Sequence, residues 1–253
     1  FYFRLLSVDM LRSTRLLPIF SKNNVMRLSY VQGRNLFTPP PVGIDITNYH
    51  CAEPVMSKET FQRHYFDIYL PLYKQLNHLL EGSPRRSESC LLTLMRKILD
   101  SPGESDIYNV AANIHNHIRF FENLQDRLEV DFDKMSDASK QKIFDNFTSL
   151  DRLQYEFECH VEAMYGSGWI WLIDKGGNLE VVSTHDNYSP EATAEGVTTI
   201  LCLDVWEHAF WKDYGIDKKK YVESFWKNVN WNVVDKRLQE AENKLQTAAR
   251  VVI

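Results

Sequence analysis

The spacing of hydrophobic positions predicts a mainly helical chain. Apolar residues recur every three or four positions along most of the sequence, which is the period of an amphipathic helix. Such helices are predicted at residues 56–80, 91–99, 109–124, 138–147, 150–164, 206–214, 218–229 and 233–250. The first should be kinked near Pro71, because proline removes a backbone donor. Its inward face is expected to consist of Phe61, Tyr65, Ile68, Leu72, Leu76 and Leu79.

A short β region interrupts the helical pattern in the second half of the chain. Apolar runs bounded by polar turns predict strands at residues 169–174, 179–183 and 198–203. The sequence Lys-Gly-Gly-Asn at 175–178 favours a hairpin between the first two strands. The chain therefore combines many helices with one small sheet.

Composition narrows the function classes. The chain of 253 residues can hold one or two domains, and its formal net charge of −5 argues against a chain devoted wholly to nucleic acid. It contains no apolar run long enough to span a membrane, so no membrane partner is expected. The cysteines Cys51, Cys90, Cys159 and Cys202 are scattered without a CxxC pair, which favours a reducing compartment.

Four segments are expected along the chain. Residues 1–50 form a basic N-terminal arm and linker, and residues 51–127 form a helical part. After an acidic boundary, residues 128–238 contain the predicted strands. Residues 239–253 extend the last helix with Lys, Glu, Gln and Ala, a composition typical of a solvated helical face.

The N-terminal arm differs from the rest in charge. Before residue 36 it carries one acid, Asp9, against six basic residues, Arg4, Arg12, Arg15, Lys22, Arg27 and Arg34. Acid-poor sequence with Arg and Ser is typical of a mitochondrial targeting segment, so a matrix location is expected. If the arm stays on the protein, a phosphate-rich partner such as RNA is the natural one to order it.

The run Asp204-Val-Trp-Glu-His208-Ala is the most specific signal for chemistry. It places a carboxylate and an imidazole four residues apart, and both are good ligands for Fe, Mn or Zn. The spacing alone fits a surface ion pair or a helix-end contact more often than a metal site. The sequence DVWEHA, however, resembles the metal-binding motif of the iron/manganese superoxide dismutase family. Three further stretches carry the same resemblance: GSGWIWL at 166–172, FWKNVNW at 225–231 and NVAANIHNH at 109–117.

The resemblance implies a fold, a ligand set and a cofactor. The fold would be α+β, with an N-terminal α-helical hairpin domain and a C-terminal α/β domain built on a small antiparallel three-stranded sheet. The family's four ligands correspond to His64, in SKETFQRHY at 57–65, and to His117, Asp204 and His208. Such a set leaves an open position for a small anion, so Fe or Mn is expected. The alternative is a relic of the fold in which the four residues are ordinary core polar groups.

Residues near the expected ligands depart from the family's pattern. The family's glutamine that hydrogen-bonds the metal-bound solvent corresponds to Asn113 or Asn187, and each amide is one methylene shorter. Without gaps, the gateway tyrosine and its partner histidine correspond to Leu72 and Ile68, with Tyr73 adjacent to the first. These changes predict a site that binds metal with an altered proton supply and substrate funnel. Two aromatic positions also differ, those of His115 and Trp211.

Two functions from different classes follow from these observations. The favoured hypothesis is a superoxide dismutase-like structural protein of the mitochondrial small ribosomal subunit, which contacts ribosomal proteins and, through the arm, rRNA. The alternative is an active mitochondrial superoxide dismutase that converts superoxide to O2 and H2O2. In the family, the residue at Glu207 crosses a dimer interface to the neighbouring ligand histidine. Its presence implies a like-folded partner, in a homodimer or a paralogous heterodimer, unless Glu207 makes only a local link.

Overall fold

The computed structural model describes residues 37–40, 52–126 and 131–251. All of them belong to one compact unit. The predicted boundary near residue 127 therefore lies inside that unit. The basic N-terminal arm lies outside the described residues, so its predicted roles stay predictions.

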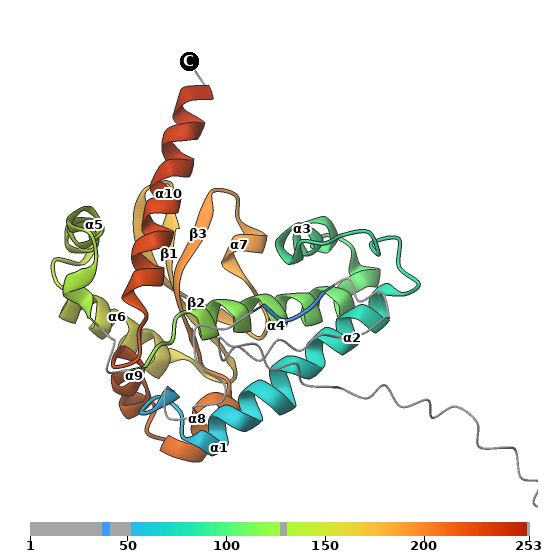
Figure 1. The fold of residues 1–253 in the computed structure, drawn as a ribbon, viewed down its shortest axis with the longest axis horizontal. Helices are drawn as coiled ribbons and strands as arrows, with labels where there is room; N and C mark the ends of the chain where they lie inside the picture. The colour runs from blue at the N-terminus through green and yellow to red at the C-terminus, as the bar shows by residue number, and fades with distance from the viewer. Residues whose placement is uncertain (1–36, 41–51, 127–130, 252–253) are drawn as a thin grey trace, which may run out of the picture. The chain divides into compact units, whose positions relative to one another are not determined.

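The predicted sheet is present and antiparallel. Strand β1 (Gly168–Lys175) lies between β2 (Asn178–His185) and β3 (Val197–Asp204) (Figure 1). Every residue of β3 and all but the last of β1 are buried, whereas β2 is largely exposed or half-buried. The register pairs Trp169 at the start of β1 with Asp204 at the end of β3. The strand pairing thus brings Asp204 into the interior beside a large aromatic ring.

Most of the predicted helices are present with small shifts at their ends. The side chains of Ser136, Ser149 and Asp217 accept backbone hydrogen bonds as N-caps, which explains three of the starting points. The helices are α3 (Leu91–Ile98), α4 (Ser105–Glu122), α5 (Asp137–Phe147), α6 (Leu150–Ala163), α8 (Glu207–Tyr214), α9 (Lys218–Trp226) and α10 (Trp231–Val251). The sequence pattern did not predict three short elements, η3 (Pro102–Glu104), η4 (Phe132–Lys134) and α7 (Pro190–Thr193).

Helix α9 ends earlier than its predicted limit at residue 229. Beyond Trp226 the chain turns so that the Asn228 side chain accepts a hydrogen bond from the backbone N–H of Val55 at 3.3 Å. The same amide donates to the backbone carbonyl of Gln125 at 3.0 Å. These contacts join three distant segments, so tertiary contacts rather than helix propensity decide where α9 ends.

The predicted first helix is divided into three consecutive pieces. It consists of α1 (Lys58–Gln62), a π-helical segment η2 (Arg63–Tyr69) and α2 (Leu70–Leu80). The backbone N–H of Leu70 donates to the carbonyl of Tyr65, five residues earlier, which is the π-helical pattern. Pro71 lies in the first turn of α2, where a helix tolerates the missing backbone N–H of proline. π-Helical turns are rare and occur mostly at functional sites.

The π-helical segment changes which side chains face inward. The buried residues of this stretch include Phe61, Tyr65, Tyr69, Tyr73, Leu76 and Leu80, and the first four are spaced by four positions. Ile68, Leu72 and Leu79, which were also expected on the inward face, are only half-buried, although Leu72 and Leu79 pack against the core. The prediction assumed 3.6 residues per turn throughout, whereas the wider turn of η2 moves the inward register along by one residue.

The remaining packing brings the helices onto the sheet and onto each other. Helices α2 and α4 lie side by side (Figure 1), and α3 contacts both α4 and α7. Helices α4 and α10 pack against β3, while α6 packs against β2. Within the described ranges, no helix combines the length and the apolar character that a membrane crossing requires.

Candidate metal centre

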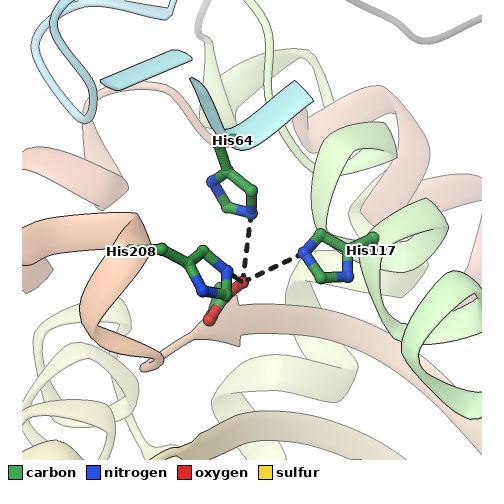
Figure 2. Close-up of side chains that lie close together, drawn as sticks. His64, His117 and His208 are labelled. Atoms are coloured by element: carbon green, nitrogen blue, oxygen red, sulfur yellow. Dashed lines mark ion pairs between the residues drawn. The ribbon is translucent and has the colours of Figure 1, made fainter. Parts of the chain in front are cut away.

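Four side chains from four different elements meet in the interior of the compact unit. They are His64 of η2, His117 of α4, Asp204 at the end of β3 and His208 of α8 (the ligand cluster). One ligand atom of each lies within 4.8 Å of the other three. The Nε2 atoms of His64, His117 and His208 lie 3.3, 3.7 and 3.3 Å from Asp204 Oδ2, and Figure 2 shows the three rings pointing toward this point. The structure thus brings together the four residues that the resemblance indicated.

A hydrogen-bonded helix start places His64 near His208. Ser57 is the N-cap of α1, and its Oγ accepts a hydrogen bond from the N–H of Thr60 at 3.3 Å. Ser57 also donates from Oγ and from its backbone N–H to the two carboxylate oxygens of Asp213, at 2.6 and 2.7 Å. Because Asp213 lies on α8, these bonds hold the helix start that precedes His64 against the helix that carries His208.

Two backbone contacts orient the ligand atoms. The Nδ1–H of His117 donates to the carbonyl of Asn113 at 2.8 Å, so the neutral ring presents the lone pair of Nε2 to the cluster. Asp204 Oδ1 accepts the backbone N–H of Trp206 at 2.7 Å, which leaves Oδ2 facing the three rings. The hydroxyl of Tyr221 donates to the backbone carbonyl of Asp204 at 2.8 Å and holds the end of β3.

The atoms that face the centre of the ligand cluster are buried without hydrogen bonds. Within the described residues, the Nε2 atoms of all three histidines and Asp204 Oδ2 have no hydrogen-bond partner. Buried polar atoms are nearly always paired, so four unpaired atoms at one point indicate a missing partner. A single cation would satisfy all of them at once. Imidazole nitrogen and carboxylate oxygen are a donor set that suits iron or manganese, so the residues fit such a metal.

The charge states of the ligand cluster are those that a metal requires. Burial lowers the pKa of His64 to about 4 and that of His117 to about 3, so both imidazoles are neutral near pH 7. Burial alone would raise the pKa of Asp204, but the attraction of His208 and His64 brings it below its usual range. Neutral histidines and an ionised carboxylate bind metal without first losing protons.

Aromatic rings enclose the ligand cluster. Their centroids lie between 5.0 and 5.8 Å from the nearest ligand ring, which leaves no room for bulk water between them. Only His208 among the ligands is appreciably exposed, with 22% of its side chain accessible against 0–1% for the others. Solvent therefore reaches the ligand cluster from the side of His208. The enclosing rings are Tyr69, Phe120, Phe121, Trp169 and Trp206.

The positions expected to form the gateway and the proton supply lie as follows. The Oδ1 atoms of Asn113 and Asn187 are buried and accept no hydrogen bond from the part of the chain that the structure describes. Tyr69 stacks on His117 with a centroid distance of 5.7 Å, and its hydroxyl lies 2.8 Å from that of Tyr73. Burial raises the pKa of both phenols far above the usual range.

Glu207, the expected interface residue, lies at the surface. Its carboxylate accepts a hydrogen bond from Ser167 Oγ at 2.8 Å, and this bond lowers its pKa. The contact within one chain is the local link that the sequence left open as an alternative. It is compatible with a further contact to a partner, because the side chain of Glu207 is exposed.

Sequence reasoning missed one residue next to this centre, Glu191 of α7. It is a buried carboxylate, and His115 Nε2 donates to its Oε2 at 2.9 Å. The only signal in the sequence was that His115 departs from the family's usual aromatic residue. Nothing in the local pattern around Glu191 indicates a helix or a buried charge.

Comparisons with known proteins give a consistent result. Residues 135–237 match the family described as iron/manganese superoxide dismutases, C-terminal domain. The superoxide dismutase [Mn] of Haemophilus ducreyi is 32% identical over 200 residues, which cover 77% of this chain and 92% of that protein. The superoxide dismutase [Fe] of Babesia bovis is 34% identical, covering 74% and 89%. The superoxide dismutase [Fe] of Leptolyngbya boryana is 34% identical, covering 80% and 98%.

Proposed function

The chain belongs to the iron/manganese superoxide dismutase family, and we propose that it is an active superoxide dismutase with its metal held by the ligand cluster. The observation that carries the proposal is the set of four unpaired ligand atoms around one point. The relatives named above are superoxide dismutases of iron and of manganese, which favours the enzyme over the structural ribosomal role. The choice between the two metals stays open, since relatives of both kinds match equally well.

The ligand cluster is suited to one-electron chemistry on a small anion. His64, His117, Asp204 and His208 would hold iron or manganese, which would supply one-electron redox chemistry for the conversion of two superoxide ions and two protons to O2 and H2O2. The chain would hold the cation with three imidazole nitrogens and one carboxylate oxygen, so the site would keep a net positive charge that attracts superoxide. The aromatic walls keep bulk water out and so strengthen this attraction. The partial exposure of His208 gives the anion its direction of approach.

We propose that Tyr69 and Tyr73, rather than Ile68 and Leu72, supply the hydrogen-bonding groups on the His117 side of the ligand cluster. The two tyrosines are buried and hydrogen-bonded to each other beside His117. Because their pKa values are raised, they stay protonated and serve as hydrogen-bond donors rather than as acids at neutral pH. Within the described residues, the Oδ1 atoms of the short amides of Asn113 and Asn187 are buried without a hydrogen-bond partner, which suits contact with an intervening water.

We further propose that the protein pairs with a like-folded partner through the surface that carries Glu207. Trp211 on the same helix is 59% exposed, and Tyr165, near the Ser167 that binds Glu207, is 89% exposed. Exposed aromatic residues beside hydrogen-bonding groups are typical of protein interfaces. The mitochondrial location and the ribosomal partners depend on the N-terminal arm and stay predictions.

The proposal is tested by loading the purified protein with iron or manganese, determining metal per chain and following superoxide decay by stopped-flow absorbance. We expect about one metal per chain and decay much faster than with the same concentration of free metal. Decay no faster than with free metal would contradict the enzyme. Sedimentation of a gentle mitochondrial lysate tests the other hypothesis, because a ribosomal subunit travels with the small subunit whereas a free enzyme stays at the top of the gradient.

A further inference from the structure

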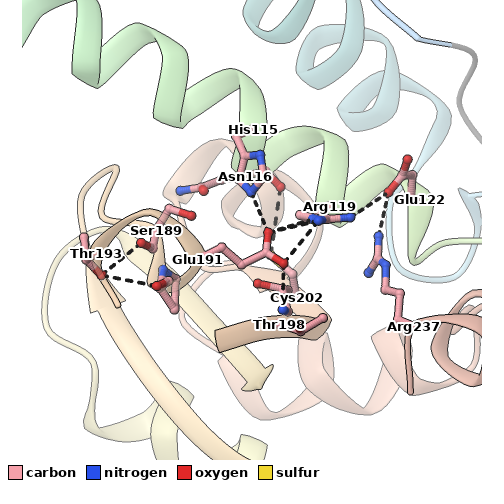
Figure 3. A network of polar contacts seen from close by, with 12 residues as sticks. His115, Asn116, Arg119, Glu122, Ser189, Glu191, Thr193, Thr198, Cys202 and Arg237 are labelled. Atoms are coloured by element: carbon pink, nitrogen blue, oxygen red, sulfur yellow. Dashed lines mark hydrogen bonds and ion pairs between the residues drawn. The ribbon is translucent and has the colours of Figure 1, made fainter. Parts of the chain in front are cut away.

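The carboxylate of Glu191 is buried and accepts hydrogen bonds on both oxygens. It is 3% exposed and lies between α4 and β3 (Figure 3). Oε2 accepts from His115 Nε2 at 2.9 Å and from Arg119 Nη2 at 2.9 Å. Oε1 accepts from the backbone N–H of Thr199 at 2.9 Å and from Arg119 Nη2 at 3.2 Å. The backbone carbonyl of Glu191 accepts from Arg96 Nη2 at 2.7 Å. These five residues form the Glu191 network.

The residues that bond the side-chain carboxylate of Glu191 lie on two of the elements that carry the ligand cluster. His115 and Arg119 are on α4 and flank His117 by two positions on either side. Thr199 is on β3, the strand that ends in Asp204. One carboxylate therefore joins the helix that supplies a ligand histidine to the strand that supplies the ligand aspartate.

The helical geometry makes this joint specific for the orientation of His117. Residues four apart lie on one face of a helix, whereas a residue two positions away lies roughly on the opposite face. Bonds to His115 and Arg119 therefore fix the rotation of α4 about its axis from the side facing away from the cluster. A rotation of α4 would carry His117 Nε2 away from Asp204 Oδ2, from which it lies 3.7 Å.

A second bridge supports the first at the end of α4. Arg119 Nη1 lies 3.7 Å from Glu122 Oε2, which accepts a hydrogen bond from Arg237 Nη2 at 2.6 Å. Arg237 Nη1 in turn donates to the carbonyl of Ile200 on β3 at 3.1 Å. The contacts of this bridge begin at Arg119, two positions after His117.

We propose that Glu191 is a positioning residue of the metal centre, which sets the orientation of His117 relative to Asp204 through α4 and β3. The inference rests on the proposed function, since it assumes that the ligand cluster holds a metal. It predicts that removing the charge of Glu191 changes the coordination of the metal as well as the stability of the fold. A carboxylate with a purely structural role would change stability alone.

The test uses Co2+ binding to the full chain, followed by visible absorption and by competition with a chelator. In Glu191→Gln the amide cannot accept hydrogen bonds on both of its terminal atoms, so the Glu191 network is broken on one side. We expect a changed Co2+ absorption spectrum and an affinity weakened by about 10–100-fold, as for other residues that orient metal ligands. The matched control is Asp174→Asn. Asp174 is buried on β1, a strand that carries no ligand, and the substitution breaks its ion pair with Lys142 Nζ at 2.7 Å. The control should bind Co2+ with the wild-type spectrum and affinity.

The outcomes separate this inference from the proposed function. A wild-type protein that binds no Co2+ would overturn the proposed metal site together with the inference. A wild-type protein that binds Co2+, with Glu191→Gln identical to it in spectrum and affinity, would overturn the inference alone. If Glu191→Gln fails to fold, Arg119→Lys decides the question, because lysine keeps the charge but loses the fork that contacts both oxygens. It should change the spectrum in the same direction, and an unchanged spectrum would count against the inference.

Discussion

Two buried carboxylates in this protein have nearly the same exposure and opposite hydrogen bonding. Asp204 and Glu191 are 0% and 3% exposed, and each lies among nitrogen-bearing side chains. Glu191 accepts hydrogen bonds on both oxygens. Asp204 directs Oδ2 at three imidazoles whose facing nitrogens are also unpaired within the described residues. Burial and charge alone therefore do not distinguish a structural group from a binding site.

The comparison shows that a binding site is recognised by whether the buried polar atoms have hydrogen-bond partners within the protein. A fully paired buried carboxylate holds elements together, and its partners are supplied by the protein. A carboxylate whose partners are themselves acceptors without protons needs a cation from outside. The ligand cluster is thus incomplete as folded, whereas the Glu191 network is complete, and substitutions should affect the two in different ways.

The largest effect should come from Asp204→Asn, which removes the anionic ligand from the incomplete group. Because the fold lowers the pKa of Asp204, its ionised carboxylate contributes stability at neutral pH, so the metal-free variant should be less stable than wild type. The gain in stability on adding Mn2+ or Fe2+ should disappear, and superoxide decay should fall to the level of free metal. For wild type, a metal concentration of about 100 times Kd contributes about 2.7 kcal/mol of stability.

Thermal unfolding with and without metal measures this effect. The same substitution at Asp174 is the control, because Asp174 is buried and lies outside the ligand cluster. Asp174→Asn should lower the unfolding temperature and keep the rise on adding metal. A metal-dependent rise that persists in Asp204→Asn would show that the cation binds elsewhere.

Glu191→Gln should weaken metal binding without abolishing it, and its cost in stability should depend on pH. Burial alone would raise the pKa of Glu191, but the hydrogen bond from His115 and the charge of Arg119 bring it below 4.5, its usual value. A group with a lowered folded pKa contributes stability above its unfolded pKa and loses it as the pH falls toward the folded value. At neutral pH, breaking this buried group should cost about 3–5 kcal/mol.

Urea unfolding of the metal-free proteins at pH 7 and at about pH 3.5 measures this dependence. The difference between wild type and Glu191→Gln should be largest at pH 7 and should shrink on acidification, because below the unfolded pKa the unfolded wild type binds a proton at Glu191 that the folded state does not bind. A difference that stays constant between the two pH values would mean that the charge of Glu191 contributes nothing and that only its shape matters.

The contrast between these two groups also explains what the sequence could and could not predict. Asp204 and His208 could be predicted because they lie four residues apart in a characteristic sequence motif. The three strands could be predicted because their apolar runs are bounded by clear turns. The pairing of His115 with Glu191 could not be predicted, because 76 positions separate the two residues and α7 is too short to show a helical repeat of apolar positions. The inward register of Tyr69 and Tyr73 was not predicted, because an apolar pattern cannot reveal a π-helical turn.

Exchanging single residues on the first helix tests this corrected register around the ligand cluster. Tyr73→Phe removes one hydroxyl of the pair and leaves that of Tyr69 buried without its partner, which should cost about 1–3 kcal/mol of stability. Superoxide decay should slow by about 10-fold, less than the loss of a direct acid–base group causes. Leu72→Ala, at the position that ungapped matching indicated, should leave the rate within about 2-fold of wild type. Stopped-flow rates that fall for Leu72→Ala and not for Tyr73→Phe would restore the original register.

The smallest effect on the isolated chain should come from Glu207→Ala at the exposed edge of the centre. Within one chain this change removes a single exposed hydrogen bond to Ser167, so stability should fall by less than about 1 kcal/mol. Ser167→Ala removes the same bond from the other side and is the matched control. If Glu207 also reaches the ligand histidine of a partner, Glu207→Ala should shift the oligomer toward monomers in sedimentation velocity runs over a range of concentrations, whereas Ser167→Ala should not. Equal behaviour of the two variants would mean that Glu207 makes only its local contact, and the ligand cluster would then be enclosed by one chain alone.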